Sequence, residues 1–295
     1  MPDYSEFQVS ELAKLFSDEL AQWREMFGEA TAQALWQTQL AGHPAVLTDI
    51  AFWEQRIREY GLPGDYFGFQ DALNGLYPER CHEVRDEMLQ RFGDSPVPGV
   101  QEQCAKALRN KGWTLANKLN DPQGAVAAYD DLLQRFGDSP VSGVQEQCAA
   151  ALLNKGVKLR QQLNDPQGAV ATYDDLLQRF GDSPVPGVQE QCAKALFNKG
   201  WTLGEKLNDP QGEVAAYDDL LQRFGDSPVP DVQEQCAEAL VNKGVTLGEK
   251  LNDPQGEVAA YDDLLQRFGD SRPRRAGAVR QGAVQQGRDA AATAQ

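Results

Sequence analysis

A block of 44 residues occurs four times in succession between residues 96 and 271. We name the copies A to D; they span residues 96–139, 140–183, 184–227 and 228–271, and most of their positions are identical. A fixed period of this length is typical of solenoids, in which each copy forms one supersecondary unit that packs against its neighbours. This repeat constrains the fold more strongly than any other feature of the sequence.

Two helices can be placed in each copy from the residues that favour helix ends. In copy A the first helix is expected from about Pro98 to Leu119. The second is expected to have Asp121 as its N-cap and Pro122 as its first residue, and to stop at Gly137, which suits a left-handed turn. The fold class is therefore predicted to be all-α.

Apolar residues at helical spacing form one stripe on each of these helices, and we expect the stripes to form the core. In copy A they are Cys104, Leu108, Gly112, Leu115 and Leu119 on the first helix, and Val126, Tyr129, Leu132, Leu133 and Phe136 on the second. Glycine in the middle of a helix costs about 1 kcal/mol relative to alanine. Its recurrence at the position of Gly112 in every copy predicts that the two helices approach closely there.

Four of the five cysteines occupy one repeated position, as Cys104, Cys148, Cys192 and Cys236. Equivalent positions in adjacent copies are expected to lie about one helix spacing apart, roughly 9 to 10 Å. A disulfide needs Cα atoms within about 7 Å. We therefore expect buried, free thiols, as in a reducing compartment.

Three segments lie outside the four copies. Residues 1–77 show helical periodicity with many aromatic residues at core spacing, and we expect them to form a helical cap on the first end of the solenoid. Residues 78–95 end in the same QRFGDS as the copies and are expected to be the second helix of a degenerate first repeat. Residues 272–295 carry five Arg and one Asp. Plausible codons for a fifth copy, read in another frame, reproduce this tail, so we interpret it as a frameshifted copy and expect it to be disordered.

The composition restricts the partners. A net charge of −16 opposes general binding to nucleic acids or anionic membranes, which requires clustered Lys and Arg. No apolar run approaches the roughly 20 residues of a membrane span, and the acidic start MPDYSEFQ is unlike a secretory signal. We expect a cytoplasmic protein that binds neither nucleic acid nor membrane.

The sequence contains no recognisable catalytic or metal-binding motif. It has no phosphate loop, no GxSxG, no HExxH and no paired CxxC, and its two histidines, His43 and His82, are isolated. Asp130 and Asp131 are adjacent on a helix and face different directions, so we interpret this pair and its copies as solvated surface. We expect no enzymatic activity, no cofactor and no metal.

The copies resemble the tetratricopeptide repeat. The resemblance is carried by Leu108, Lys111, Gly112 and Leu115 in the first helix and by Ala125 and Tyr129 in the second. Three features differ from that family: the period is 44 rather than 34 residues, Lys111 stands where Leu is usual, and Gly137 stands where Pro is usual. The additional residues fall mainly in SPVPGVQEQ, before and within the first helix. The resemblance implies a right-handed α-solenoid of antiparallel helix pairs that holds a protein or peptide in a groove lined by the first helices.

Differences among the copies are concentrated at five positions spaced i, i+3, i+7, i+10 and i+11, on one face of the first helix and apart from the core stripe. In the order of copies A to D these positions are occupied by Lys106, Ala150, Lys194 and Glu238; by Arg109, Leu153, Phe197 and Val241; by Trp113, Val157, Trp201 and Val245; by Ala116, Arg160, Gly204 and Gly248; and by Asn117, Gln161, Glu205 and Glu249. The family resemblance places these positions in the groove.

Two interpretations of this variable face are open. It could be a solvent-exposed surface that has drifted, or a recognition groove that has diversified. Exposed positions elsewhere, such as Gln101 and Gln134, have not drifted, and exposed Trp113, Phe197 and Trp201 would form an apolar patch typical of interaction sites. We favour the groove, and the predicted partner-binding residues are all those of the variable face except its alanines and glycines.

The sequence therefore predicts a non-catalytic scaffold that binds a protein or peptide. Arrays of this kind resemble the sensing parts of bacterial signalling or conflict proteins. Two alternatives remain open: residues 1–77 could be an effector or enzymatic domain that the repeats regulate, or the solenoid could self-assemble through an uncapped C-terminal end.

Overall fold

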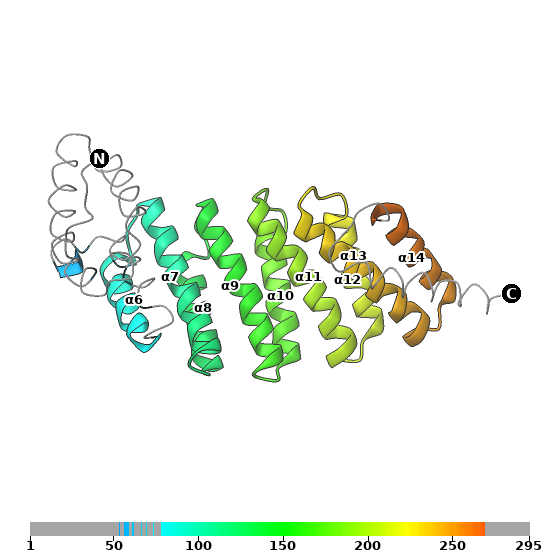
Figure 1. The fold of residues 1–295 in the computed structure, drawn as a ribbon, viewed down its shortest axis with the longest axis horizontal. Coiled ribbons are helices and arrows are strands. Elements are labelled where there is room, and N and C mark those ends of the chain that lie inside the picture. The colour runs from blue at the N-terminus through cyan, green and yellow to red at the C-terminus, as the bar shows by residue number, and fades with distance from the viewer. Residues whose placement is uncertain are drawn as a thin grey trace, which may run out of the picture. The chain divides into compact units, whose positions relative to one another are not determined.

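The computed structural model describes residues 78–268 together with Trp53, residues 56–58, Gly61, Tyr66, Phe69 and Leu73. Every regular element in this part of the chain is a helix, which confirms the predicted all-α class (Figure 1). The tail at 272–295 and most of the predicted N-terminal cap lie outside the described residues. Among the described helices, none combines the length and the apolar character that a membrane span requires.

The helices follow the repeat. They are α6 (Pro78–Phe92), α7 (Pro98–Asn117), α8 (Pro122–Phe136), α9 (Ser142–Gln161), α10 (Pro166–Phe180), α11 (Pro186–Lys206), α12 (Pro210–Phe224), α13 (Pro230–Val245) with the short π-helix η1 (Thr246–Lys250), and α14 (Pro254–Phe268). Each copy thus contributes one pair. The chain divides into an N-terminal unit, residues 1–114, and a C-terminal unit, residues 115–295.

In the C-terminal unit the helix pairs stack in chain order (Figure 1). Each second helix packs on the first helix of the next copy, and α9, α11 and α13 also contact one another directly. Three first helices therefore form a continuous layer. A surface on that layer can be built from several copies at once.

The predicted start of the second helices is confirmed. In copy B the backbone N–H of Gly168 donates to Asp165 Oδ1 at 2.8 Å, and Pro166 is the first helical residue. This side-chain cap satisfies one of the N–H groups that a helix leaves without an internal partner. The first helix of copy A ends at Asn117, two residues before its predicted end at Leu119.

The predicted left-handed glycine after the second helix is wrong. Gly137 has φ −59° and ψ −28°, which is right-handed helical backbone. The left-handed residue is instead the asparagine that precedes each N-cap, such as Asn164 with φ 51°, because asparagine tolerates this region better than most residues. Glycine at the equivalent Gly181 leaves room for a neighbour: a Cβ there would lie 2.9 Å from Nη1 of Arg223.

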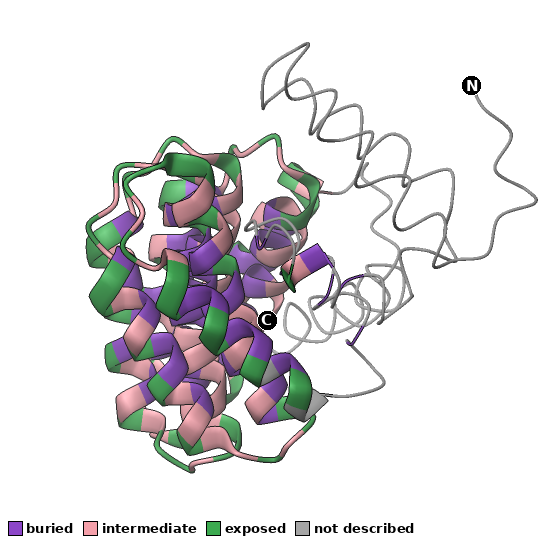
Figure 2. Ribbon diagram, turned by 90° about the vertical axis from the view of Figure 1, so that its left-hand side faces the viewer, coloured by how far each residue is buried: buried purple, intermediate pink, exposed green. Residues whose placement is uncertain are grey.

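Most of the predicted core is confirmed. In copy B the side chains of Cys148, Leu152, Tyr173, Leu176 and Phe180 are buried, and Figure 2 shows buried residues along the inner faces of the helices. The outer members of both stripes differ from the prediction, because they are only half-buried. These are Leu115, Leu119, Val126 and Leu133 in copy A and their equivalents in copy B. Alanines complete the core on both helices, including Ala149, Ala151 and Ala169.

The predicted close approach at the mid-helix glycine is also confirmed. A Cβ on Gly156 would lie 2.4 Å from Cε1 of Tyr173, and one on Gly200 would lie 2.6 Å from Cε1 of Tyr217. The tyrosine ring of the second helix therefore rests on the backbone of the first. Glycine at this position fixes how closely each pair packs.

Ion pairs join each copy to the next at constant register. Lys155 Nζ lies 2.5 Å from Asp130, and Lys199 Nζ lies 2.6 Å from Asp174. This lysine, at a position where the repeat that the copies resemble usually has Leu, thus binds the preceding copy. The second aspartate of each pair binds its own helix, as Asp131 does with Arg135 at 2.6 Å. The aspartate pairs are half-exposed, but they are not merely solvated as expected, and each exposed ion pair contributes on the order of 0.2–1 kcal/mol.

In the N-terminal unit, α6 contacts α7 as a second helix contacts the next copy. Lys111 Nζ lies 2.5 Å from Asp86, and Cys104 Sγ lies 3.6 Å from the Phe92 carbonyl oxygen. Of the aromatic residues before α6, Tyr66 and Phe69 are buried, as predicted for a core. The Tyr66 hydroxyl donates to Glu87 at 2.7 Å. The role of residues 1–77 as a cap remains a prediction.

The cysteines are buried and free, as predicted. Burial raises the pKa of the Cys148 and Cys192 thiols to about 12. A thiol-reactive chromogenic disulfide at neutral pH is therefore expected to modify none of the five cysteines of the folded chain and all five in denaturant. Rapid reaction of the folded protein would contradict the burial.

Because the raised pKa means that the folded chain holds these thiol protons more tightly than the unfolded chain does, the free energy of unfolding is expected to fall as the pH rises above about 9.

Candidate partner-binding groove

The variable face is not uniformly exposed, which corrects the expectation from the sequence. The last variable position is exposed in all four copies, whereas Leu153 is 8% exposed and Gly204 is buried. Gly204 is covered by the side chain of Glu213 from α12. The predicted site residues are exposed at Lys106, Trp113, Asn117, Gln161, Glu205 and Glu249, half-buried at Arg109, Val157, Arg160, Lys194, Phe197, Trp201, Glu238, Val241 and Val245, and buried at Leu153.

The predicted apolar patch takes a different form in the structure. Trp113 is 45% exposed and lies in the N-terminal unit. Phe197 and Trp201 are half-buried and lie together in the C-terminal unit, where they line a pocket between α9 and α11 of about 470 Å³. The aromatic residues thus form the wall of a cavity.

Both copies B and C contribute to this pocket. Copy B supplies Arg160, Gln161 and Asn164. Copy C supplies Phe197, Asn198, Trp201 and Lys206. Four of these seven residues were predicted from the variable positions: Arg160, Gln161, Phe197 and Trp201. A second, larger pocket lies at the loops of copies B and C and also includes Pro228 of copy D. Its lining residues are identical in all four copies, so variation distinguishes the first pocket from it.

The aromatic side chains of the pocket are held in place by their neighbours. The Arg160 guanidinium carbon lies 4.4 Å from the centroid of the Trp201 ring, and Lys206 Nζ lies 5.7 Å from it. Phe197 packs against Tyr217 of α12, with ring centroids 5.8 Å apart. Arg160 Nη2 also donates to Asn198 Oδ1 at 3.3 Å. A cation over an indole ring is worth about 0.5–2 kcal/mol, so this arrangement orders both the cation and the ring.

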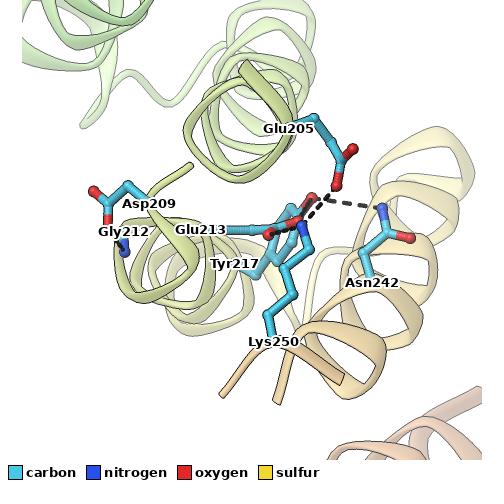
Figure 3. A network of polar contacts seen from close by, with 7 residues as sticks. All are labelled: Glu205, Asp209, Gly212, Glu213, Tyr217, Asn242 and Lys250. Atoms are coloured by element: carbon cyan, nitrogen blue, oxygen red, sulfur yellow. Dashed lines mark hydrogen bonds and ion pairs between the residues drawn. The ribbon is translucent and has the colours of Figure 1, made fainter. Parts of the chain in front are cut away.

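A different polar arrangement occupies the equivalent place between copies C and D (Figure 3). Lys250, at the end of η1, lies 2.6 Å from Glu205 and 3.1 Å from Glu213. The Tyr217 hydroxyl donates to Glu213 at 3.3 Å and accepts from Asn242 at 3.5 Å. Burial alone would lower the pKa of Lys250, but hydrogen bonds to the two glutamates raise it above its ordinary value.

Sequence reasoning missed the central residue of this network. Glu213 is 3% exposed and lies on a second helix, away from the variable face. Its carboxylate fills the space beside Gly204, where a Cβ would lie 1.9 Å from Glu213 Oε2. The signal was present in the chain: copies C and D have glutamate at this position and glycine at the position of Gly204, whereas copies A and B have alanine and a larger residue.

The described residues contain no group of three or more His, Cys, Asp or Glu side chains placed to hold a metal ion. The pocket between α9 and α11 offers aromatic surface, amides and two cations. These groups can stack on a ligand and donate hydrogen bonds to it.

Comparison with protein families identifies the repeat. The model of the family described as tetratricopeptide repeat matches residues 106–139 and 150–183. The chain contains tetratricopeptide repeats. Each matched segment has the usual length of that repeat, so the additional residues of the period precede it, as the sequence predicted. Tetratricopeptide repeats indicate a protein–protein interaction scaffold.

A solved structure is also similar to the chain. It is the crystal structure of PilW, a widely conserved type IV pilus biogenesis factor, with 16% sequence identity and a TM-score of 0.42. The similarity covers 88% of this chain and 96% of that one. No curated protein matches the sequence.

Proposed function

We propose that the chain binds a protein partner along its layer of first helices, with the pocket between α9 and α11 as the principal recognition site. One observation carries this proposal: five of the seven residues that line the pocket occupy positions that differ among otherwise near-identical copies. Drift on a solvated surface would not place tryptophan and phenylalanine together around a cavity. Those predicted site residues of the C-terminal unit that are exposed or half-buried keep their proposed role as the groove around this pocket. Lys106, Arg109 and Trp113 keep theirs as contacts on the N-terminal unit.

The proposed mechanism is anchoring by aromatic residues with selectivity from charge. Trp201 and Phe197 provide large rigid surfaces, which is the property that makes aromatic residues dominate binding energy. Charge differs along the layer, with Arg160 and Lys206 around the pocket and Glu205 and Glu249 beyond it. This pattern would favour partners with complementary charges. We propose that the protein is non-catalytic and cytoplasmic and serves as the sensing part of a bacterial signalling or conflict system.

Partner capture tests this function. The intact chain, immobilised and exposed to native lysate, is expected to retain a specific partner, and Trp201→Ser and Phe197→Ser are each expected to reduce its recovery by at least about tenfold. Leu265→Ser is the matched control, because Leu265 is also apolar and is 41% exposed on α14, a second helix outside the layer. Undiminished capture by Trp201→Ser, or a large loss of its thermal stability, would show that Trp201 is a core residue and not a contact.

A further inference from the structure

The pocket between α9 and α11 is cationic in a strongly acidic chain. Its lining contains Arg160 and Lys206, three side-chain amides and two aromatic rings, and none of its lining residues is acidic. The whole chain carries a net charge of −16. Two cations without a carboxylate among the lining residues are therefore a local exception.

We call the contact region between two consecutive copies a joint, so the pocket lies at the earlier joint, between copies B and C. At the later joint, between copies C and D, the chain itself neutralises the lysine at the equivalent position. Lys250 is the equivalent of Lys206, one period later, and it binds Glu205 and Glu213. In copy B the residues equivalent to these two glutamates are Gln161 and Ala169, and both are neutral. At the later joint Lys250 therefore faces two glutamates. At the earlier joint Lys206 and the additional Arg160 line a pocket that has no acidic lining residue.

Buried donors at the earlier joint also lack acceptors among the described residues. Arg160 Nε is buried without a hydrogen-bond partner, and the guanidinium reaches only the neutral amide of Asn198. The Tyr173 hydroxyl, on a side chain that is fully buried, likewise has no partner. Its equivalent, Tyr217, donates to the Glu213 carboxylate. Of these two residues only Arg160 lines the pocket, and an unpaired donor there favours a ligand that supplies acceptor oxygens.

We propose that the pocket binds the carboxylate of an aspartate or glutamate side chain in the partner, with an apolar residue of the partner packed on Trp201 and Phe197. This inference rests on the proposed function of the groove and names the chemistry of the ligand. A side chain is favoured over a chain end because the group that binds Lys250 and Tyr217 in the next joint is the side chain of Glu213. Arg160 and Lys206 supply the charge, and the amides of the pocket supply further donors.

Selection from a displayed library of random peptides tests this chemistry. Each peptide is fused to its carrier through its C-terminus, so that only side chains can supply carboxylates. The intact wild-type chain is expected to select peptides enriched in Asp or Glu beside an apolar residue. A synthetic peptide of the selected sequence, with a C-terminal amide, is expected to bind the wild-type chain at least about tenfold more tightly than the R160Q/K206Q variant. Its affinity for the wild-type chain is expected to fall with added salt.

Matched variants isolate the role of the pocket. K155Q/R179Q removes the same charge from residues outside the pocket lining, and it is expected to bind the peptide as the wild-type chain does. Replacing the acidic residue of the peptide by its amide is expected to weaken binding to the wild-type chain and to leave binding to R160Q/K206Q unchanged. The charge-reversed R160E/K206E variant is expected to select basic peptides.

The possible failures are distinguishable. Selected peptides that compete for the pocket but show no acidic preference would overturn this inference and leave the groove function intact. If this library gave no acidic preference but a second library displayed with free C-termini did, the inference would also be overturned, in favour of a chain-end carboxylate. Failure to select any peptide would count against both proposals.

Discussion

Replacing Gly156 with alanine is expected to destabilise the solenoid by about 1–3 kcal/mol, because the added methyl group must displace the Tyr173 ring. The direction of this change in the free energy of unfolding is informative. Glycine to alanine in the middle of a helix ordinarily stabilises it by about 1 kcal/mol. The shift of the urea midpoint at unchanged slope measures the effect.

Gly99→Ala is the matched control for this prediction. Gly99 also lies in a first helix, but a methyl group added to it would meet no neighbouring side chain within 4 Å. Its replacement is expected to be neutral or slightly stabilising. If Gly156→Ala behaved in the same way, the tyrosine ring would not rest on the helix backbone, and the recurrence of this glycine would need another reason.

Replacing Lys250 with methionine is expected to cost about 3 kcal/mol of folding free energy, because it leaves the buried Glu213 carboxylate without its cation. The stem of methionine keeps most of the packing of the lysine stem. The loss should therefore come mainly from the unpaired charge, and urea denaturation of the whole chain measures it.

Two further variants test the origin of that loss. Adding Glu213→Ala to Lys250→Met should recover most of the stability, because it removes the buried carboxylate that would otherwise lack a cation. Lys206→Met, at the equivalent position one copy earlier, should cost well under about 1 kcal/mol, because Lys206 has no comparable buried carboxylate beside it. Equal losses from Lys206→Met and Lys250→Met would rule out Glu213 as the cause.

The sequence was sufficient to predict the helix pairs because their determinants are local. Asp165 and Pro166 act within one turn of the helix that they begin. The Gly156 contact was predictable because a costly mid-helix glycine recurs in every copy. The left-handed residue was assigned wrongly, since glycine and asparagine both suit that conformation. The structure shows that Gly181 instead accommodates Arg223 of the next copy, a long-range contact that no local rule contains.

The candidate site was predictable only where the copies differ on one face. Variation identified Arg160 and Trp201, but it could not show that their side chains stack across two helices. Asn198 was not predicted as a site residue, because asparagine occupies this position in every copy. Glu213 was not predicted because it lies on the second helix of its copy, away from the variable face. Its role also depends on Gly204, which leaves space for its carboxylate.

The contacts that join consecutive copies have a consequence for how this chain could change. The Asp–Lys pairs between copies use residues that are identical in every copy, as does the glycine–tyrosine contact within each copy, so these contacts do not depend on the order of the copies. The pocket behaves differently, because Arg160 and Gln161 come from copy B whereas Trp201 and Lys206 come from copy C. No single copy encodes it. Exchanging the order of two copies by recombination would keep the shared contacts and replace the pocket. Under the proposed function, the order of the copies would therefore determine what the groove can bind.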